Sequence, residues 1–227
     1  DVHKEMMAFM NGLLPQMNTG VSTMAVLKNE VDEKSQALSE EWKEHIPELK
    51  ENPGVARPLY HPLDNRVTAS AVYENGKIIM KTLQPIHVLE DGREVKMPIH
   101  CESDGTLRLI DYIPFVFSVI YENKIYVVDE IERSLHPILI KEIIAKLSAI
   151  PEAKGQLIFT THESCLLDQK ILRSDEIWFA EKDGGQATHL YPLSDFKIHN
   201  TANIENGYLN GRYGGIPFLA NLRDLNW

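Results

Sequence analysis

The sequence predicts an α/β protein with a parallel sheet and flanking helices, preceded by an antiparallel β and helical N-terminal region. The first observation is that two short apolar runs, IYVV at 125–128 and GQLIFTT at 155–161, enclose a stretch with helical apolar spacing. This order is typical of a parallel sheet with a helical crossover. The second is that Asn75-Gly76 and Asp91-Gly92 each separate strand-like runs. Such pairs are strong hairpin signals because both residues accept positive φ.

The first hundred residues, 1–100, are expected to form a region of helices and hairpins. Apolar residues at helical spacing predict a helix over 1–17, and its Met-rich face is expected to pack in a core. A short strand is predicted over 20–27. Residues 29–50 are dense in Glu and Lys, with apolar residues three, four or seven apart. They predict an exposed amphipathic helix that ends before Pro53.

Residues 101–227 are expected to form the α/β core. The run IYVV has four consecutive apolar residues, which suits a strand buried on both faces, as in a parallel sheet. Pro137 occupies an early helix position that needs no amide donor. The other predicted elements are a helix over 104–120, a helix over 137–150, a short helix over 163–169, and a third strand, EIWFA at 176–180, turned by Asp183-Gly184-Gly185 into 188–191.

Composition narrows the class of protein. The formal net charge is −10, which argues against an unspecific grip on nucleic acid over most of the surface. The longest apolar runs are far shorter than the roughly 20 residues of a spanning helix, and no signal peptide is evident. The two cysteines, Cys101 and Cys165, are too few for a disulfide framework, so we expect a cytoplasmic protein that has no membrane segment.

Two carboxylates, Asp129 and Glu130, directly follow the strand IYVV. A parallel sheet delivers such residues to its carboxyl edge, where ligands commonly bind. In a nucleotide hydrolase the first acid would hold Mg²⁺, usually through water, and the second would polarise the attacking water. Both must stand at the same strand end to face one γ-phosphate. The alternative is a pair of solvated acids that cap the next helix.

Three further features surround these acids in the sequence. Glu102-Ser103-Asp104-Gly105-Thr106 lies at a predicted helix start, where Ser103 is a natural N-cap and free amides can bind phosphate. Ser134-Leu135-His136-Pro137 is a tight loop. His162 directly follows the strand GQLIFTT, so it could reach the same γ-phosphate and sense its presence. Taken singly, an ordinary cap and a satisfied strand-end histidine are the alternatives.

In this order the four features resemble those of ABC-type ATPases, in particular the SMC-like and RecF-like branch. Ser103 to Thr106 resembles a divergent signature motif, and Ile125 to Glu130 resembles Walker B. Ser134 to Pro137 resembles the D-loop, and His162 the switch histidine. The segments RSDEIWF at 173–179 and GYLNGRYG at 207–214 resemble a bacterial AAA-type group within that branch that is often linked to abortive infection and phage defence.

The resemblance implies a P-loop NTPase-like fold, an ABC ATPase head, and ATP and Mg²⁺ as ligands. In that family two heads sandwich two nucleotides. Asp129 would be the Mg²⁺ partner, Glu130 the general base and His162 the γ-phosphate sensor. Ser103, with Asp104, Gly105 and Thr106, would act on the nucleotide of a second head. Glu102, Asp104 and Thr106 depart from the common LSGGQ form of the signature.

A Walker A motif, GxxxxGK[ST], is missing from the 227 residues. The only Gly-Lys is Gly76-Lys77, which lies in a predicted hairpin, has Ala71 where the first glycine belongs, and is followed by Ile78. The family places this motif well before the signature, so we expect it upstream of Asp1 or on another segment. The isolated chain is therefore expected to bind ATP poorly.

Other functions fit parts of the same pattern. A metal-dependent nuclease would use Asp129, Glu130 and Glu132 to hold Mg²⁺, with Glu181 and Asp183 as further candidates. A non-catalytic module would dimerise or dock a partner through 29–50 and 207–215. A zinc site at His162-Glu163-Ser164-Cys165 lacks a second ligand pair at metal-site spacing. The expected partners are a second ATPase head, the segment with Walker A, and a nuclease effector or DNA.

Overall fold

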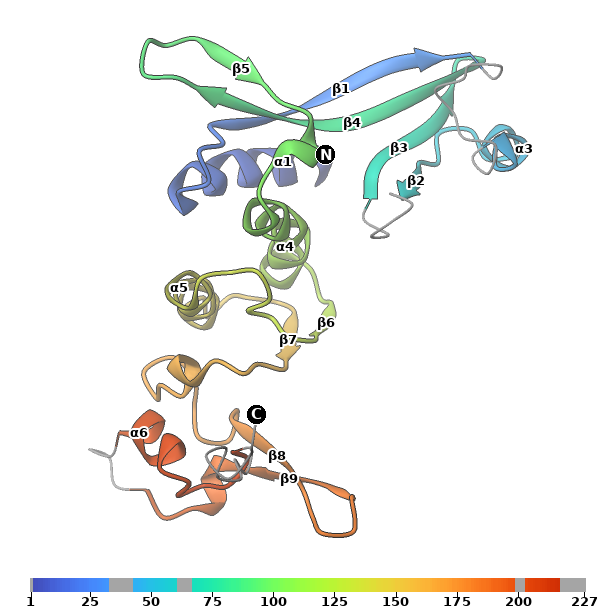
Figure 1. Cartoon of the computed structure of the whole chain (residues 1–227). Coiled ribbons are helices and arrows are strands. Elements are labelled where there is room, and N and C mark those ends of the chain that lie inside the picture. The colour runs from blue at the N-terminus through green and yellow to red at the C-terminus, as the bar shows by residue number, and fades with distance from the viewer. Residues whose placement is uncertain (1, 33–42, 61–66, 199–202, 217–227) are drawn as a thin grey trace, which may run out of the picture. The chain divides into compact units, whose positions relative to one another are not determined.

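The computed structural model describes residues 2–32, 43–60, 67–198 and 203–216 (Figure 1). The chain forms two compact units, Asp1–Phe117 and Ser118–Trp227. We call them the N-terminal and C-terminal units and describe each by itself. The predicted division of the chain into a helical and hairpin region, 1–100, and an α/β core, 101–227, stays a prediction.

The N-terminal unit is built on an antiparallel sheet with strand order β1-β4-β3-β2, in which β5 also pairs with β4. Both predicted hairpin turns are present. Asn75 and Gly76 have φ of 51° and 80°, and Gly92 has φ of 81°, as tight turns between antiparallel strands require. The elements in chain order are α1 (Val2–Leu13), η1 (Leu14–Met17), β1 (Thr23–Val31), α3 (Ile46–Glu51), β2 (Arg57–Tyr60), β3 (Val67–Glu74), β4 (Lys77–Val88), β5 (Glu94–Lys96), η2 (Ile99–Cys101) and α4 (Asp104–Tyr121), whose last residues belong to the C-terminal unit.

The helix predicted over 29–50 is wrong at its start. Residues 29–31 continue strand β1 because they pair with Met80, Ile79 and Ile78 of β4. At the other end the prediction is confirmed, since α3 covers Ile46–Glu51. Residues 33–42 lie outside the described part of the chain.

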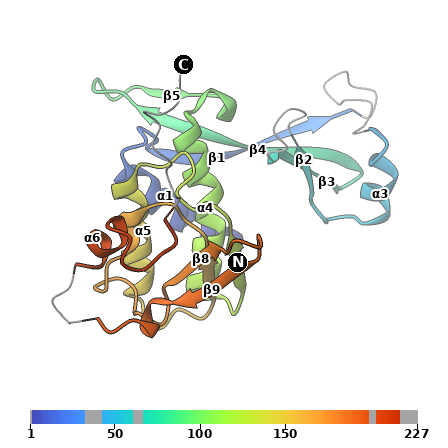
Figure 2. The ribbon, with the colours of Figure 1, turned by 60° about the horizontal axis from the view of Figure 1, so that its bottom comes forward.

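Two separate clusters form the core of the N-terminal unit. The first joins the Met-rich face of α1 to β1 and α4, which confirms the predicted core role of that face; Met10 and Leu14 are 1% and 0% exposed. The second packs Ile46 and Leu49 of α3 against β3 and β4. Figure 2 shows α3 beside β2 and β3, at the other end of the sheet from α1.

The C-terminal unit contains the predicted strand–helix–strand order. β6 (Ile125–Val128) and β7 (Gln156–Phe159) pair in parallel, with Val128 opposite Phe159 at their carboxyl ends. The crossover is α5 (Pro137–Ser148), which begins at the predicted proline. The remaining elements are η3 (Ser164–Leu166), β8 (Trp178–Lys182), β9 (Thr188–Pro192), η4 (Leu193–Asp195) and α6 (Ile204–Leu209).

The predicted core differs from the structure in two details. First, among the described residues only β6 and β7 pair in parallel, so the third predicted strand is not part of that sheet. Strand β8 instead pairs antiparallel with β9, which confirms the predicted turn from 176–180 into 188–191. Second, β6 is not buried on both faces. Ile125 and Val127 are 67% and 75% exposed, and Ile158 of β7, one of their neighbours, is 48% exposed. We call these three residues the open apolar face.

The tail of the C-terminal unit packs into an aromatic cluster. The ring of Phe179 stacks on those of Tyr208 and Tyr213, with centroids 5.6 and 6.0 Å away. Tyr213 is 2% exposed, and a Cβ at Gly207 would come within 2.7 Å of its ring. Tyr208 and Tyr213 therefore contribute to a core, whereas residues 209–212 are exposed. The docking role of 207–215 stays a prediction.

Candidate functional site

The polar residues after β6 and those after β7 meet at one edge of the parallel pair. Asp129 and Glu130 follow β6, and Thr160, Thr161 and His162 follow β7. The strands are parallel and in register, so their carboxyl ends lie together. The structure thus brings together the three residues for which the sequence suggested metal, base and sensor roles. All three belong to the C-terminal unit.

Thr160 ties the two strand ends to each other. Its hydroxyl donates to Asp129 Oδ1 and accepts from the Glu130 backbone amide at 2.9 Å. Its carbonyl accepts from the Ile131 amide at 3.1 Å. One side chain therefore fixes both acids. Sequence reasoning missed this role, although a hydroxyl residue at the end of an apolar strand was its signal.

Glu130 adopts a left-handed backbone conformation, with φ of 49°. This region is uncommon for residues other than Gly, Asn and Asp, and such strain recurs at functional sites. The conformation is held at both ends, by Thr160 at the amide and by the Arg133 amide, which donates to the Glu130 carbonyl at 3.0 Å. The Glu130 carboxylate remains accessible, with 49% of its side chain exposed.

His162 stands beside this carboxylate. Its Nε2 lies 3.8 Å from Glu130 Oε1, and its side chain is 84% exposed. A carboxylate and an imidazole thus share one accessible edge, where each can reach an outside molecule. Such a pair suits proton abstraction from water next to a charged group.

Glu132 is turned the other way. Its Oε1 accepts from the His162 backbone amide at 2.9 Å, while its Oε2 is buried and has no hydrogen-bond partner in the structure as described. Burial raises the pKa of Glu132, but hydrogen bonds from the His162 amide and the Thr161 hydroxyl outweigh it, and the pKa lies below its ordinary value. Glu132 is therefore an ionised acceptor for the loop after β7.

The loop before α5 serves the start of that helix. His136 Nδ1 accepts from the Ile138 amide at 3.3 Å, and Pro137 is the first helical residue. Ser134 has φ of 63°, which turns the chain sharply after the acids. The segment that resembles a D-loop is thus a tight turn followed by a helix cap.

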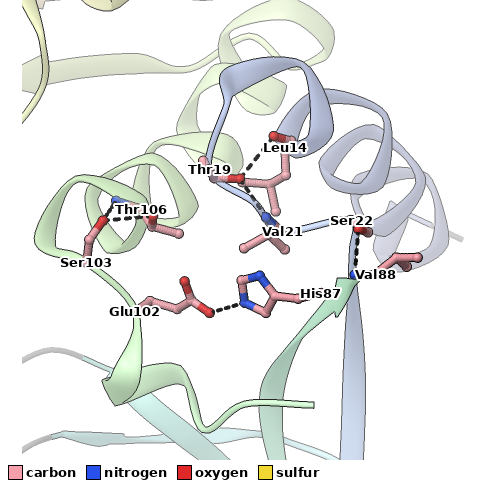
Figure 3. Close-up of polar contacts among 9 residues, drawn as sticks. All are labelled: Leu14, Thr19, Val21, Ser22, His87, Val88, Glu102, Ser103 and Thr106. Carbon is pink, nitrogen blue, oxygen red and sulfur yellow. Dashed lines mark hydrogen bonds and ion pairs between the residues drawn. The ribbon is translucent and has the colours of Figure 1, made fainter. Parts of the chain in front are cut away.

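The segment that resembles the signature motif lies in the N-terminal unit, at the start of α4 (Figure 3). Ser103 is the N-cap, as predicted: its Oγ accepts from the Thr106 amide at 3.1 Å and lies 2.9 Å from the Thr106 hydroxyl. Thr106 is 6% exposed, whereas Ser103 and Asp104 are exposed and Gly105 is half-buried. The Ser103 hydroxyl is therefore already engaged within the helix start.

A second contact fixes the residue before the cap. Glu102 Oε1 and His87 Nε2 of β4 are 2.7 Å apart, and their side chains are 6% and 19% exposed (Figure 3). This pair joins the sheet of the N-terminal unit to the chain that leads into α4. It leaves Glu102 no exposed carboxylate for a phosphate or a metal.

The acids named for a nuclease site are engaged elsewhere. Glu181 accepts from the Tyr191 hydroxyl at 3.0 Å, within the β8–β9 hairpin. Asp183 accepts from its own turn, and a hydrogen bond from His189 together with the Ala187 and Gly185 amides holds its pKa below the ordinary value. Among the described residues, no three His, Cys, Asp or Glu side chains are grouped to hold one metal ion.

Comparison with known proteins gives one family. The model of the family described as "AAA domain, putative AbiEii toxin, Type IV TA system" matches residues 18–168, which is more than half of the chain. The match includes the antiparallel sheet from β1 onward and both strand ends of the candidate site. No curated protein matches the chain. Within the part of the chain that the structure describes, no helix is long and apolar enough to cross a membrane.

Proposed function

Because the chain belongs to this AAA-domain family of P-loop, ABC-like ATPases, we propose that it is the water-activating part of an ATP-hydrolysing head. The observation that carries the proposal is the shared edge of β6 and β7, where the Glu130 carboxylate and the His162 imidazole lie 3.8 Å apart and accessible. Asp129 stands beside them, fixed by Thr160.

Asp129 is suited to a magnesium ion. Mg²⁺ in nucleotide sites is usually held by one or two carboxylates, water and the phosphates of the substrate. Asp129 is exposed and uses its Oδ1 for Thr160, so Oδ2 can face a hydrated ion. When bound, Mg²⁺ supplies positive charge to the β- and γ-phosphate oxygens.

Glu130 is the general base of the proposal. It takes a proton from the water that attacks the γ-phosphorus, while the bond from that phosphorus to the bridging β-γ oxygen breaks and ADP leaves. The Glu130 carboxylate lies beside the His162 ring, whereas Glu132 accepts from the His162 backbone amide. His162 donates a hydrogen bond to a γ-phosphate oxygen, which joins its position to the state of the nucleotide.

The phosphate cradle comes from another polypeptide segment in this proposal. The sequence has no GxxxxGK[ST], and among the described residues β6 and β7 pair only with each other. A two-stranded parallel sheet with an open apolar face is marginal by itself. A further parallel strand would deliver a glycine-rich loop to the same edge as Asp129 and Glu130.

The remaining partner is a second head. In the dimer, the helix start that carries Ser103 of one head faces the nucleotide of the other. We propose that ATP turnover drives a DNA-related or phage-defence process, with DNA or a nuclease effector as the downstream partner. The family description, which names a toxin of a type IV system, supports a defence role.

The test is Mg²⁺-dependent ATP hydrolysis by a head that contains this chain and a P-loop segment. Asp129→Asn is expected to lower turnover by about 100-fold or more and to weaken its dependence on Mg²⁺. The isolated 227-residue chain is expected to bind ATP poorly. Micromolar ATP affinity of the isolated chain, or divalent-dependent nucleic-acid cleavage lost in Asp129→Ala, would contradict the proposal.

A further inference from the structure

Two residues after β7, Thr160 and His162, contact the acidic turn after β6. The Thr160 hydroxyl bonds Asp129 and the Glu130 amide, and the His162 amide donates to Glu132. We call this set of contacts the strand-end clasp. It means that the loop bearing the imidazole and the turn bearing the acids move as one piece.

We propose that Glu132 is a positioning residue, which holds the His162 imidazole at its place beside Glu130 by accepting the His162 backbone amide. This role rests on the proposed function only where it concerns hydrolysis. The hydrogen bond itself and its effect on the loop do not depend on nucleotide.

The two glutamates of the turn, Glu130 and Glu132, contact different parts of His162. Ile131, between them, is 1% exposed and anchors the turn in the core of the unit. On one side the Glu130 carboxylate is half exposed and faces His162 Nε2. On the other side Glu132 faces the His162 backbone. Two carboxylates thus lie beside one histidine, Glu130 at its ring and Glu132 at its backbone amide, and the second oxygen of Glu132 is buried.

The histidine depends on this anchor more than a buried residue would. Its side chain is 84% exposed, so core packing cannot set its direction. Hydrogen bonds that involve a charged group are stronger than neutral ones. The depressed pKa of Glu132 keeps the acceptor ionised at neutral pH, which supports a persistent contact.

The experiment measures hydrogen exchange of the His162 amide and the NMR chemical shifts of its imidazole ring in the 227-residue chain. Glu132→Ala is expected to speed exchange of this amide about tenfold, as loss of one charge-assisted hydrogen bond implies. It should also change the ring chemical shifts, because the ring leaves the Glu130 carboxylate. Glu132→Gln keeps an acceptor oxygen and is expected to restore most of the protection. Glu142→Ala, an exposed glutamate on α5, is the matched control.

In the ATP-hydrolysing head, Glu132→Ala is expected to lower kcat about 10- to 100-fold with little change in KM for ATP, since the histidine is misplaced and the nucleotide cradle is intact. Unchanged amide exchange and unchanged ring chemical shifts of His162 in Glu132→Ala overturn the positioning role. If that variant fails to fold, Glu132→Gln decides the matter: loss of His162 protection with an acceptor still present also overturns it. If Glu130→Gln leaves turnover unchanged, the proposed function fails whatever Glu132 does.

Discussion

The helix start at residues 102–106 and the strand-end turn at residues 129–132 differ in how their polar groups are used. At the helix start, Ser103 bonds Thr106, and Glu102 is paired with His87 out of solvent. At the strand-end turn, one acid is bonded inward and another is exposed in a strained backbone conformation. The first arrangement is complete by itself, while the second leaves a carboxylate and an imidazole for an outside molecule.

This difference shows what a motif-like sequence does and does not reveal. Both segments were singled out because polar residues stand where an element begins or ends. An N-cap needs a side chain such as that of Ser103 whether or not a ligand binds. The left-handed backbone at Glu130 costs about 1–3 kcal/mol of strain, whereas an N-cap stabilises its helix. The strand-end turn is therefore the stronger candidate for chemistry.

The largest effect on stability is expected from Gly155→Ala, which disturbs the packing of β7 against β6 on which the strand-end turn depends. A Cβ at Gly155 would lie 2.5 Å from the Lys124 carbonyl oxygen and 3.0 Å from that of Glu122. Both are backbone atoms that cannot turn away, and the substitution moves β7 against β6. We expect a loss of about 2–3 kcal/mol in unfolding free energy, measured by denaturant titration. Gly184→Ala, whose Cβ would meet nothing within 4 Å, should be nearly neutral. Equal losses in the two variants would contradict this packing.

Thr160→Val tests the strand-end turn alone, because it removes only the hydroxyl that bonds Asp129 and the Glu130 amide. The Glu130 amide loses its acceptor and Asp129 loses its donor, so about 1.5 kcal/mol of stability should be lost. The Glu130 amide should also exchange faster by NMR. Thr160→Ser keeps the hydroxyl and is expected to retain most of both properties. A valine variant as stable as the native chain would show that the hydroxyl does not hold the turn.

Ser103→Ala tests the helix start at residues 102–106. Loss of the N-cap is expected to cost about 1 kcal/mol, seen as a lower midpoint in denaturation. Ser103→Asp keeps a good cap and should restore that stability, yet its charge would oppose a phosphate of a second head. If Ser103→Asp restores stability and also leaves ATP hydrolysis by the assembled head unchanged, Ser103 is a structural cap only.

The smallest effect concerns pH. The pKa of Glu132 is depressed in the folded chain, so the stability that its ionised form contributes is present above the unfolded-state pKa. It is lost as the pH falls through the folded-state value. The difference in unfolding free energy between the native chain and Glu132→Gln should therefore shrink on acidification from pH 7 to about pH 3. A difference that grows would mean that Glu132 is not ionised in its contact.

Local chemistry explains which parts of the fold were predictable. Asn75-Gly76 marks a hairpin by its own backbone preferences, and Pro137 marks the start of α5. The exposed face of β6 was not predictable, because IYVV is apolar on both sides and gives no alternation to read. Its burial depends on what packs against Ile125 and Val127. Pairing of β8 with β9 was predictable, because Asp183-Gly184-Gly185 marks the turn between them.

The candidate site was predictable in its residues and not in its orientation. Asp129, Glu130 and His162 follow apolar runs, and parallel strands bring such residues to one edge. The left-handed backbone at Glu130 and the contact of Glu132 with the His162 amide are features that neither composition nor spacing records. Thr160 stayed unnoticed because its residue type is common at the ends of strands.

The most direct test of a water-activating Glu130 is single-turnover ATP hydrolysis by the assembled head with Glu130→Gln. Loss of a general base is expected to slow hydrolysis by about 10²- to 10⁴-fold, while ATP stays bound and holds the dimer together. Glu142→Gln, on the exposed side of α5, should hydrolyse ATP at the native rate. Hydrolysis by Glu130→Gln at the native rate would contradict the account.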